Sequence, residues 1–288
     1  MILITTAGKV GTAAATLLAE RGVPVRLLVR SPDKAATLEK VGPEIVQGDL
    51  NAAESVERAL VGVKSVILVS PPVVSQELNV IKYAKDAGVE HVVKITTLAS
   101  ADSPIQRRRN HFEIEEALIA SGLGHTLLRN NAYMQNFLMM APLIAKTSGF
   151  ATATGEGKIG HLDARDVAAV AAEIAASPAA HVGKTYWPTG PERLSGLEVA
   201  EIFSDVLRRT ITFTPISFEQ QKQAMLDAGL PEPVADDNAR AVSMMADGDC
   251  DYITDDVPNI LGRPAGSFRQ FVTDFAGAFT PAPDQGVP

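Results

Sequence analysis

The sequence predicts an α/β fold, a doubly wound parallel sheet with a smaller α+β lobe toward the C-terminus. Two observations carry this prediction. Apolar segments alternate with amphipathic segments through the first 130 residues, as strands and helices do in successive βαβ units. The apolar segments are continuous runs, which is typical of parallel strands covered by helices on both faces.

The first half of the chain supplies six expected strands with helices between them. The strands are expected at Ile2–Thr5, Val25–Val29, Glu44–Val46, Ser65–Val69, His91–Ile95 and His125–Leu128. The helix after the first strand has apolar residues at helical spacing, at Val10, Ala13, Ala14, Leu17 and Leu18. A glycine follows each helix, where a left-handed C-cap favours this residue. These glycines are Gly22, Gly42, Gly62, Gly88 and Gly122.

In the second half of the chain, strands and helices no longer alternate regularly. Helices are expected at Asn131–Lys146, Asp163–Ala176, from Ser195, at Phe218–Ala228 and at Ser267–Phe279, and a strand at Thr210–Pro215. Ser195 and Glu198 form a capping-box pattern. We expect the sheet domain over residues 1–150, with segments from 151–190 returning to its sheet. A small lobe is expected over 191–279, and a Pro-rich, disordered tail over 280–288.

Composition excludes several classes of protein. The chain has 288 residues, 46% of them hydrophobic and 21% charged, with a net charge of -8, which is ordinary usage for a soluble protein. Without an extended basic face, nucleic acid is not an expected partner. The only dense cationic run, Arg107-Arg108-Arg109, is interpreted as a solvated loop.

The cysteine and histidine residues and the hydropathy of the chain further limit the classes of protein that we expect. Cys250 is the single cysteine, so no intrachain disulfide is expected, and its neighbours Asp249 and Asp251 disfavour a reactive thiolate. The histidines lack metal-ligand spacing, so no metal is expected. A strand at the N-terminus leaves no room for a signal peptide, and no apolar stretch reaches bilayer length. We expect a cytoplasmic protein without a membrane partner, and a homodimer is left open.

The segment between the first strand and the first helix indicates a dinucleotide site. Thr5-Thr6-Ala7-Gly8-Lys9-Val10-Gly11 places glycines at the second and third positions of a phosphate-binding turn, where backbone N–H groups face a pyrophosphate. Thr5 takes the position of the first glycine. If that position needs a positive φ, threonine costs about 1–2 kcal/mol. The alternative interpretation is a structural turn without ligand.

The end of the second strand bears on which coenzyme binds. An acidic residue there would favour NAD(H) by binding the ribose 2′-hydroxyl. This chain instead has Arg30-Ser31-Pro32-Asp33-Lys34. Because a guanidinium can pair with a 2′-phosphate, Arg30, assisted by Lys34, predicts NADP(H) in preference to NAD(H). The alternative is a surface arginine that merely ends a strand.

Three further strand ends carry candidate coenzyme contacts. Asp49 and Leu50 follow the third strand, where an adenine would lie, although Asp49 is equally an N-cap candidate for the next helix. Ser70-Pro71-Pro72 follows the fourth strand and makes a rigid loop. Thr96-Thr97 follows the fifth, at the carboxyl edge where ligands of open α/β sheets bind.

These motifs, in this order and spacing, resemble a known family. The Thr5–Gly11 turn, Leu28-Val29-Arg30-Ser31-Pro32, Gly48-Asp49-Leu50, and the stretch from Thr126 to Tyr133 with Asn136 are similar to the NmrA-like branch of the atypical short-chain dehydrogenase/reductases. Within it, the chain looks most like bacterial NAD(P)H-dependent quinone reductases and triphenylmethane-dye reductases. The resemblance extends through Phe268–Phe279 and implies a Rossmann domain with a small C-terminal substrate lobe.

The resemblance also assigns roles by position. It implies that Gly8, Gly11 and Arg30 hold the coenzyme, that Thr96 and Thr97 approach the nicotinamide, and that Asn131, Ala132 and Tyr133 flank the substrate. Phe137 and its neighbours on the following helix are either core or one wall of a flat apolar cleft for aromatic acceptors. The coenzyme-binding residues we expect are Thr5, Thr6, Gly8, Lys9, Val10, Gly11, Arg30, Lys34, Asp49, Leu50, Ser70, Pro71, Thr96 and Thr97.

The chain lacks the Tyr-x-x-x-Lys pair of the wider superfamily. Arg107 and His111 stand at the matching positions. Carbonyl reduction needs a proton donor in place, whereas a quinone, an enone or a cationic dye accepts hydride to give a delocalised or neutral product. Such a product takes any proton it needs from water. His111 is therefore either a ribose ligand in place of lysine or a helix-start histidine in a polar loop. Tyr133 is either a donor to a substrate oxygen or part of the core.

These observations lead to a functional hypothesis with one alternative. We expect an NADPH-dependent reductase that passes hydride directly to a small conjugated acceptor, with His111 and Tyr133 as the candidate catalytic residues. The alternative is a regulatory protein that binds NADP(H) and senses redox state without turnover. It is favoured by the missing Tyr and Lys and by Thr5 in the glycine turn.

Overall fold

The structure is a computed structural model, which describes residues 1–31 and 42–281. The chain forms two compact units. Unit 1 comprises Met1–Asn130, Ala164–Pro188 and Asp256–Arg263, and unit 2 comprises Asn131–Asp163, Thr189–Asp255 and the chain from Pro264 onward. The chain first passes from unit 1 to unit 2 after Asn130. The domain boundaries predicted at residues 150 and 190 stay predictions. The tail predicted to be disordered, residues 280–288, lies mostly outside the described residues.

Unit 1 is built on a seven-stranded parallel sheet, as the continuous apolar runs predict. Its strands are β1 (Ile2–Ile4), β2 (Val25–Val29), β3 (Glu44–Gln47), β4 (Ser65–Leu68), β5 (His91–Thr96), β6 (Gly124–Arg129) and β8 (Lys184–Tyr186). Their order in the sheet is β3-β2-β1-β4-β5-β6-β8. The strand order therefore reverses between β1 and β4, where Ile2 pairs with Val25 on one side and Ser65 on the other.

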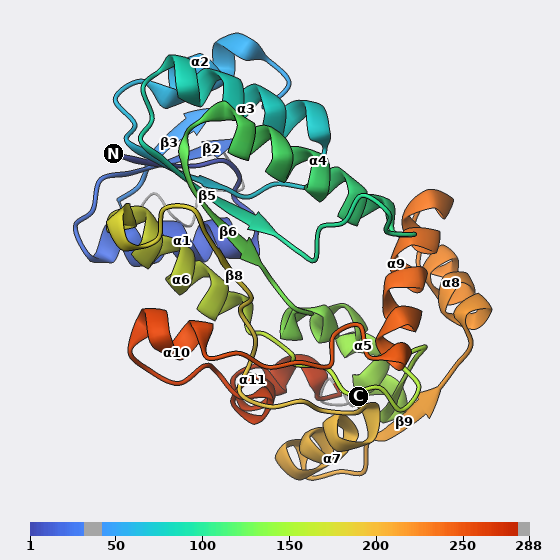
Figure 1. The fold of residues 1–288 in the computed structure, drawn as a ribbon. Helices are drawn as coiled ribbons and strands as arrows, with labels where there is room; N and C mark the ends of the chain where they lie inside the picture. Colours follow the sequence, from blue (N-terminus) through green and yellow to red (C-terminus); the bar gives the residue numbers. More distant parts are fainter. Residues whose placement is uncertain (32–41, 282–288) are drawn as a thin grey trace, which may run out of the picture. The chain divides into compact units, whose positions relative to one another are not determined.

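Helices cover both faces of this sheet (Figure 1). One face carries α2 (Ala53–Leu60), α3 (Val74–Asp86) and α4 (Gln106–Ser121), and the other carries α1 (Lys9–Glu20) and α6 (Ala164–Ala176). The unit is completed by the short elements η3 (Pro178–Ala180) and α10 (Asp256–Leu261). The alanine-rich sequence of α6 lets it pack closely on α1 and the sheet, because small side chains allow close approach of backbones. This arrangement confirms the predicted Rossmann-type fold.

The glycine caps predicted at Gly22, Gly62, Gly88 and Gly122 are confirmed, since each follows a helix and has a φ between 69° and 77°. Gly42 also has a positive φ, 101°, but the helix expected before it lies outside the described residues. Gly122, at φ 77°, is the left-handed C-cap of α4, a conformation that costs glycine no Cβ clash.

Unit 2 contains a two-stranded parallel sheet and several helices. The strands are β7 (Gly149–Thr152) and β9 (Thr212–Pro215). The helical elements are η2 (Met134–Asn136), α5 (Phe137–Thr147), α7 (Gly196–Leu207), α8 (Phe218–Asp227), α9 (Glu232–Met244), η4 (Met245–Asp247), α11 (Phe268–Asp274) and η5 (Ala276–Phe279). A cluster of buried phenylalanines joins α5, β7, α7 and α11. The predicted capping box is confirmed, since Ser195 accepts from the Glu198 amide and Glu198 accepts from that of Ser195.

Several sequence predictions need correction. Residues 131–146 form a 3-10 turn and a shorter helix, and residues 267–279 divide similarly into α11 and η5. Residues 107–109 are the first turn of α4 and not a solvated loop, with Arg108 only 7% exposed. β7, β8, α9 and α10 were not predicted. β7 and β8 have four residues or fewer, too few for a period to emerge, and pairing with distant strands fixes them.

Candidate functional site

A cavity lies at the carboxyl ends of β1, β2, β3 and β4, next to the point where the strand order reverses. Its volume is about 380 Å³, within the range of about 300–1,000 Å³ typical of small-molecule sites. Of the coenzyme-binding residues expected from the sequence, seven line it. These are Thr5, Thr6, Gly8, Arg30, Asp49, Leu50 and Pro71. The open edge of a doubly wound sheet at its switch point is where this class of fold binds ligands.

In the glycine turn, the backbone of Thr6 lies close to the first turn of α1. Gly8 is the N-cap in an extended conformation, and no side chain caps this helix end or places an acid in its first turn. A Cβ added to Gly8 would find only the Thr6 hydroxyl, at 3.8 Å, whereas one on Gly11 would lie 1.9 Å from the Thr6 carbonyl oxygen. Gly11 therefore serves the packing of the turn, while the space beside Gly8 opens toward the cavity. A helix N-terminus with this access suits a phosphate group.

Thr5 does not strain the turn. Among the described residues outside glycine, only Ser148 and Arg208 have positive φ, so the cost considered for Thr5 does not arise. Its hydroxyl donates to the Val69 carbonyl oxygen at 2.9 Å and accepts from the Val69 amide at 2.9 Å. The Thr6 hydroxyl donates to the same carbonyl at 2.7 Å. The two threonines thus join the end of β1 to the end of β4, across the switch point.

Arg30 lines the cavity and is exposed directly after β2. Its backbone oxygen accepts from the Gln47 side chain at 3.2 Å, which ties it to the end of β3. An exposed arginine at the cavity can meet an anionic group there. Lys34, the expected second cation, lies outside the described residues.

Asp49 lines the cavity but is not the N-cap of the next helix. That position belongs to Ala52. Asp49 Oδ1 instead accepts from the backbone amide of Asn51 at 2.8 Å and from its side chain at 2.9 Å, forming a local turn. The adjoining Leu50 is buried, and its carbonyl accepts from Asn79 at 3.1 Å. The N-cap interpretation is therefore wrong, and the carboxylate is held at the cavity wall.

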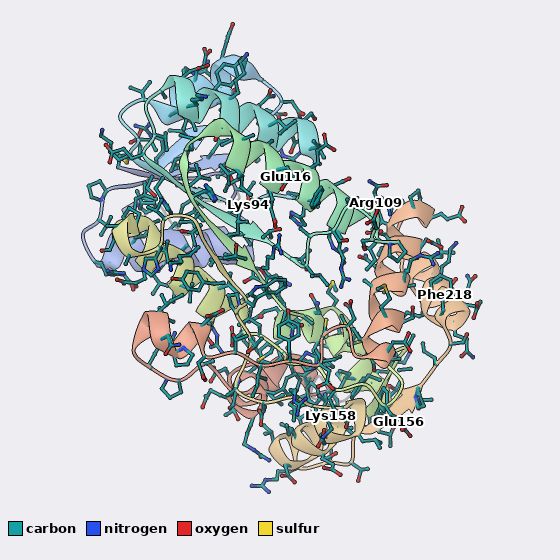
Figure 2. The ribbon with its side chains drawn as sticks, in the orientation of Figure 1. Lys94, Arg109, Glu116, Glu156, Lys158 and Phe218 are labelled. Carbon is teal, nitrogen blue, oxygen red and sulfur yellow. The ribbon has the colours of Figure 1, made fainter. Side chains whose placement is uncertain are left out.

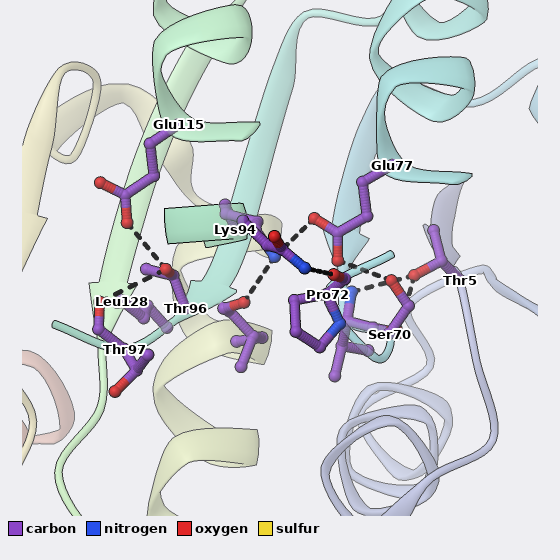
Figure 3. Close-up of polar contacts among 12 residues, drawn as sticks. Thr5, Ser70, Pro72, Glu77, Lys94, Thr96, Thr97, Glu115 and Leu128 are labelled. Atoms are coloured by element: carbon purple, nitrogen blue, oxygen red, sulfur yellow. Dashed lines mark hydrogen bonds and ion pairs between the residues drawn. The ribbon is translucent and has the colours of Figure 1, made fainter. Parts of the chain in front are cut away.

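A buried ion pair supports the wall formed after β4 (Figure 3). Lys94 on β5 and Glu77 on α3 have side chains that are 0% exposed, and Nζ lies 2.5 Å from Oε2. Lys94 also donates to the Ile95 carbonyl at 2.8 Å, and Glu77 Oε1 accepts from the Ser70 hydroxyl at 2.6 Å. Burial raises the pKa of Glu77, and Lys94 opposes that shift. Figure 2 shows Lys94 inside unit 1, at the level of the sheet.

Sequence reasoning missed this pair. Lys94 was read as part of an apolar strand, and Glu77 gave no signal because its position within α3 is compatible with a solvated face. The pair fixes Ser70, whose neighbour Pro71 lines the cavity. Ser70 itself does not line the cavity, and its expected contact with a coenzyme stays a prediction.

Thr96 and Thr97 belong to a separate polar group at the end of β5. The buried Thr96 hydroxyl donates to Glu115 at 2.7 Å, and Glu115 pairs with Arg129 on β6. The Arg129 guanidinium in turn lies 5.1 Å from the centre of the Trp187 ring. Neither threonine lines the cavity, and their approach to a nicotinamide stays a prediction. Lys9, Val10 and Gly11 are likewise absent from its lining.

His111 lies in the second turn of α4 and is buried, 6% exposed. Burial, followed by the charges of Lys94 and Arg107, lowers its pKa to about 2. Its Nδ1 has no hydrogen-bond partner in the described part of the chain. The interpretation as a helix-start histidine in a polar loop is therefore wrong. A neutral imidazole of this kind can donate or accept one hydrogen bond but cannot serve as a cation.

A second, smaller cavity lies within unit 2. Its volume is about 110 Å³, and its lining is mostly apolar. Three of the four residues expected at the substrate, Ala132, Tyr133 and Phe137, line it. Burial raises the pKa of the Tyr133 phenol, so this side chain remains protonated and can only act as a neutral hydrogen-bonding group. Tyr133 also pairs through its backbone with Leu162 in an isolated bridge.

Asn131, the fourth expected substrate residue, is hydrogen-bonded within unit 2, and its contact with a substrate stays a prediction. Its amide nitrogen donates to the Cys250 carbonyl at 3.1 Å, and its side-chain oxygen accepts from the Ala132 amide at 2.7 Å. Both polar atoms are thus engaged within unit 2, and Asn131 does not line the cavity. His161 does line it, although the sequence considered this residue only as a metal ligand and gave no signal for a cavity.

Two further features of the described residues bear on other functions. No group of three or more His, Cys, Asp or Glu side chains lies placed to hold a metal ion within residues 1–31 and 42–281. Within the same residues, no helix combines the length and apolar character needed to cross a bilayer.

Comparison with known proteins places the chain among NAD(P)H-dependent reductases. The model of the NmrA-like family matches residues 1–256. An NAD(P)H azoreductase from Xenophilus azovorans is 37% identical over 94% of this chain and 96% of its own length. A (4-alkanoyl-5-oxo-2,5-dihydrofuran-3-yl)methyl phosphate reductase from Streptomyces griseus is 34% identical over 98% of this chain and 100% of its own. An Escherichia coli NADPH-dependent quinone oxidoreductase solved with NADPH superposes with a TM-score of 0.86, at 29% identity over 96% and 100% of the two chains.

Proposed function

The chain belongs to the NmrA-like family, and on that basis we propose that this NAD(P)H-dependent oxidoreductase passes hydride directly from NADPH to a small conjugated acceptor. One observation carries the proposal. The cavity of unit 1 joins an uncapped helix N-terminus, the open side of Gly8 and the exposed Arg30 at the switch point of the sheet. These are the features needed for a pyrophosphate with a further phosphate beside it.

The residues of unit 1 fit a nicotinamide dinucleotide. The turn at Gly8 and the first turn of α1 would hold the pyrophosphate, and Asp49 and Leu50 would contact the adenosine. When bound, the reduced coenzyme supplies the hydride, and the protein supplies position and exclusion of water. His111 stays a proposed contact of the coenzyme ribose. Its low pKa limits it to a hydrogen bond made by a neutral ring.

The choice of acceptor follows from what the chain lacks. Arg107 and His111 replace the tyrosine and lysine that protonate an alkoxide in carbonyl reduction. The buried Tyr133 phenol, with its raised pKa, can hold a substrate oxygen by a hydrogen bond. The names of the relatives specify an azo compound, an oxo-dihydrofuran and a quinone, all conjugated systems that delocalise the electrons they accept. We extend this acceptor class to the present chain.

Turnover tests the proposal. Purified protein with NADPH should show loss of absorbance at the nicotinamide band when quinones, azo dyes or enones are added. NADPH binding measured by calorimetry provides the control. Tight binding without turnover of any acceptor would contradict the reductase and favour the redox-sensing alternative, whereas absence of binding would contradict both.

Arg30 tests the preference for NADPH. We expect Arg30→Ala to weaken NADPH by about tenfold to a hundredfold, since a hydrogen bond to a charged group contributes about 1.5–3 kcal/mol, and to leave NADH nearly unchanged. Arg21→Ala is the matched control, because Arg21 is also exposed in unit 1 but pairs with Glu173 at 3.0 Å, away from the cavity lining. Equal losses for the two coenzymes would remove Arg30 from the 2′-phosphate.

A further inference from the structure

The chain directly after β4, residues 69–73, forms one wall of the unit 1 cavity, and we call it the β4 loop. Pro71 and Val73 line the cavity. Within the loop, the Val73 amide donates to the Pro71 carbonyl oxygen at 2.6 Å. Pro71 and Pro72 have no N–H group of their own, so the rest of unit 1 has few groups by which to hold the loop. Its position therefore depends on a small number of contacts.

Three neighbouring elements hold the β4 loop, each at a different residue. The backbone of Val69 is bonded to a threonine hydroxyl directly after β1, at 2.9 Å. Asn110 on α4 donates to the Pro72 carbonyl oxygen at 3.0 Å. The Ser70 hydroxyl donates to Glu77 Oε1 on α3 at 2.6 Å (Figure 3). Of these three anchors, that of Ser70 is the one whose acceptor can carry a charge.

Lys94 on β5 completes the Ser70 anchor. Its Nζ lies 2.5 Å from Glu77 Oε2, and both side chains are 0% exposed. Fold stability alone does not explain two buried charges, because apolar residues of similar volume often stabilise such positions equally well or better. Burial raises the pKa of Glu77 and the Lys94 ammonium lowers it, so the lysine favours the carboxylate. A carboxylate accepts a hydrogen bond more strongly than a neutral group does, and the donor at its other oxygen is Ser70.

We propose that Lys94 is a positioning residue for the coenzyme, because it holds Glu77 in place as the acceptor that anchors Ser70. The β4 loop is thereby kept in one conformation at the cavity wall before a ligand arrives. Preorganisation of this kind raises affinity, since the loop need not be ordered when the ligand binds. This inference rests on the proposed function in taking NADPH as the ligand. Its consequence is that NADPH affinity depends on the buried pair even in a variant whose stability does not.

Two double variants separate the charges from the acceptor. Lys94→Met/Glu77→Met removes both charges and the acceptor of Ser70, whereas Lys94→Met/Glu77→Gln removes both charges and keeps a carbonyl oxygen. We expect the first variant to bind NADPH about fivefold to tenfold more weakly in calorimetry, about the effect of one hydrogen bond. We expect the second to recover most of this affinity, which a merely structural role of the charges would not produce. Wild-type affinity in the first variant, or equal losses in both, would overturn the inference.

A second cycle distinguishes an anchor at Ser70 from a direct contact between Ser70 and the coenzyme. Ser70→Ala is made in the wild type and in Lys94→Met/Glu77→Met. We expect it to weaken NADPH about fivefold to tenfold in the wild type and to cause no further loss in the double variant, where the same contact is already absent. Equal losses in both backgrounds would show that Ser70 acts independently of the pair and would overturn the inference.

A matched control tests whether removal of any ion pair has the same effect. Lys64 and Glu90 form an exposed pair of unit 1 at 2.6 Å, and neither residue lines the cavity. Lys64→Met/Glu90→Met removes the same two charges, and we expect it to leave NADPH affinity unchanged. A loss as large as that of Lys94→Met/Glu77→Met would overturn the inference.

Amide hydrogen exchange measures the hold on the β4 loop without coenzyme, so it separates this inference from the proposed function. In the ligand-free protein, the Val73 amide should exchange faster in Lys94→Met/Glu77→Met than in the wild type. Faster exchange without NADPH binding in any variant would retain the anchor and refute the coenzyme. Equal exchange and equal NADPH affinity in all variants would retain the reductase and refute the role of Lys94. If the double variant does not fold, Ser70→Ala decides, and unchanged affinity and exchange in it overturn the inference.

Discussion

The cavity of unit 1 has walls fixed by directional polar contacts, whereas the cavity of unit 2 is framed by packed aromatic rings. In unit 1, Thr5 and Thr6 hold Val69, and Lys94 with Glu77 holds Ser70. In unit 2, Phe137 makes ring contacts with Phe150, His161, Phe203 and Phe268. Polar contacts have narrow geometry and a large penalty when one partner is lost. Ring packing tolerates changes of shape more readily.

The difference matches the two kinds of ligand proposed for this chain. A dinucleotide is the same molecule in every turnover, so a wall held by hydrogen bonds in one geometry suits it. The conjugated acceptors proposed for this chain vary in outline, and a cavity framed by packed rings tolerates such variation. Substitutions should therefore cost more in the wall of unit 1 than in that of unit 2.

The largest effect is expected at the buried ion pair. Lys94→Met leaves the Glu77 carboxylate buried without its cation, and we expect a loss of about 3–5 kcal/mol in the free energy of unfolding. The double variant Lys94→Met/Glu77→Met replaces both charges with apolar groups and should recover most of this loss. Urea denaturation of the wild type, both single variants and the double variant gives the coupling energy. A loss below about 1 kcal/mol in Lys94→Met would contradict the expectation that the polar wall of unit 1 is the more sensitive of the two.

The glycine turn should give the next largest effect. Gly11→Ala forces a Cβ against the Thr6 carbonyl oxygen, which lies 1.9 Å from its ideal position, and should cost up to about 3 kcal/mol of stability. Gly8→Ala is the matched control for folding, since its Cβ has room and its φ of -80° suits alanine. We expect Gly8→Ala to keep its thermal midpoint and lose NADPH affinity by calorimetry. Undiminished NADPH affinity in Gly8→Ala would argue against phosphate at this turn.

A pH effect of intermediate size is expected from His161. Its pKa is about 4 in the folded protein and 6.5 in the reference state, so between these values the unfolded chain binds more protons. Stability therefore falls as pH drops below about 6.5, by about 1.4 kcal/mol per pH unit. At pH 5 this amounts to about 2 kcal/mol relative to pH 7. Denaturation measured at both pH values should show that His161→Phe loses less stability between pH 7 and pH 5 than the wild type, by that amount. Equal losses in the two proteins would contradict the burial of a neutral ring.

The smallest effect is expected in the aromatic frame. Phe137→Leu keeps an apolar side chain and loses edge contacts between rings, so we expect a cost of about 1 kcal/mol. Urea denaturation measures it, and calorimetry with benzene shows whether the cavity persists. A cost as large as that of Lys94→Met would show that ring geometry in unit 2 is as restrictive as the polar contacts of unit 1.

The outline of the proposed coenzyme site was predictable because it consists of loops that follow strands. Once the βαβ order is known, Thr5, Arg30, Asp49 and Pro71 must meet at one edge of the sheet. The Lys94–Glu77 pair was not predictable, since nothing local links a strand lysine to a helix carboxylate seventeen positions earlier. Asp49 illustrates a further limit of prediction from sequence. An aspartate is common both as a helix N-cap and as a ligand contact, so the residue type alone does not distinguish the two roles.

The parallel sheet, its glycine-capped helices and the glycine turn after β1 could be predicted from the sequence, since each depends on the period and chemistry of neighbouring residues. The interior placement of His111 and Lys94, the hydrogen bonds of Asn131 and the presence of His161 at the cavity of unit 2 became visible only in the folded chain. These depend on which distant segments pack together, and burial of a polar side chain changes its protonation and partners in ways that local pattern does not record.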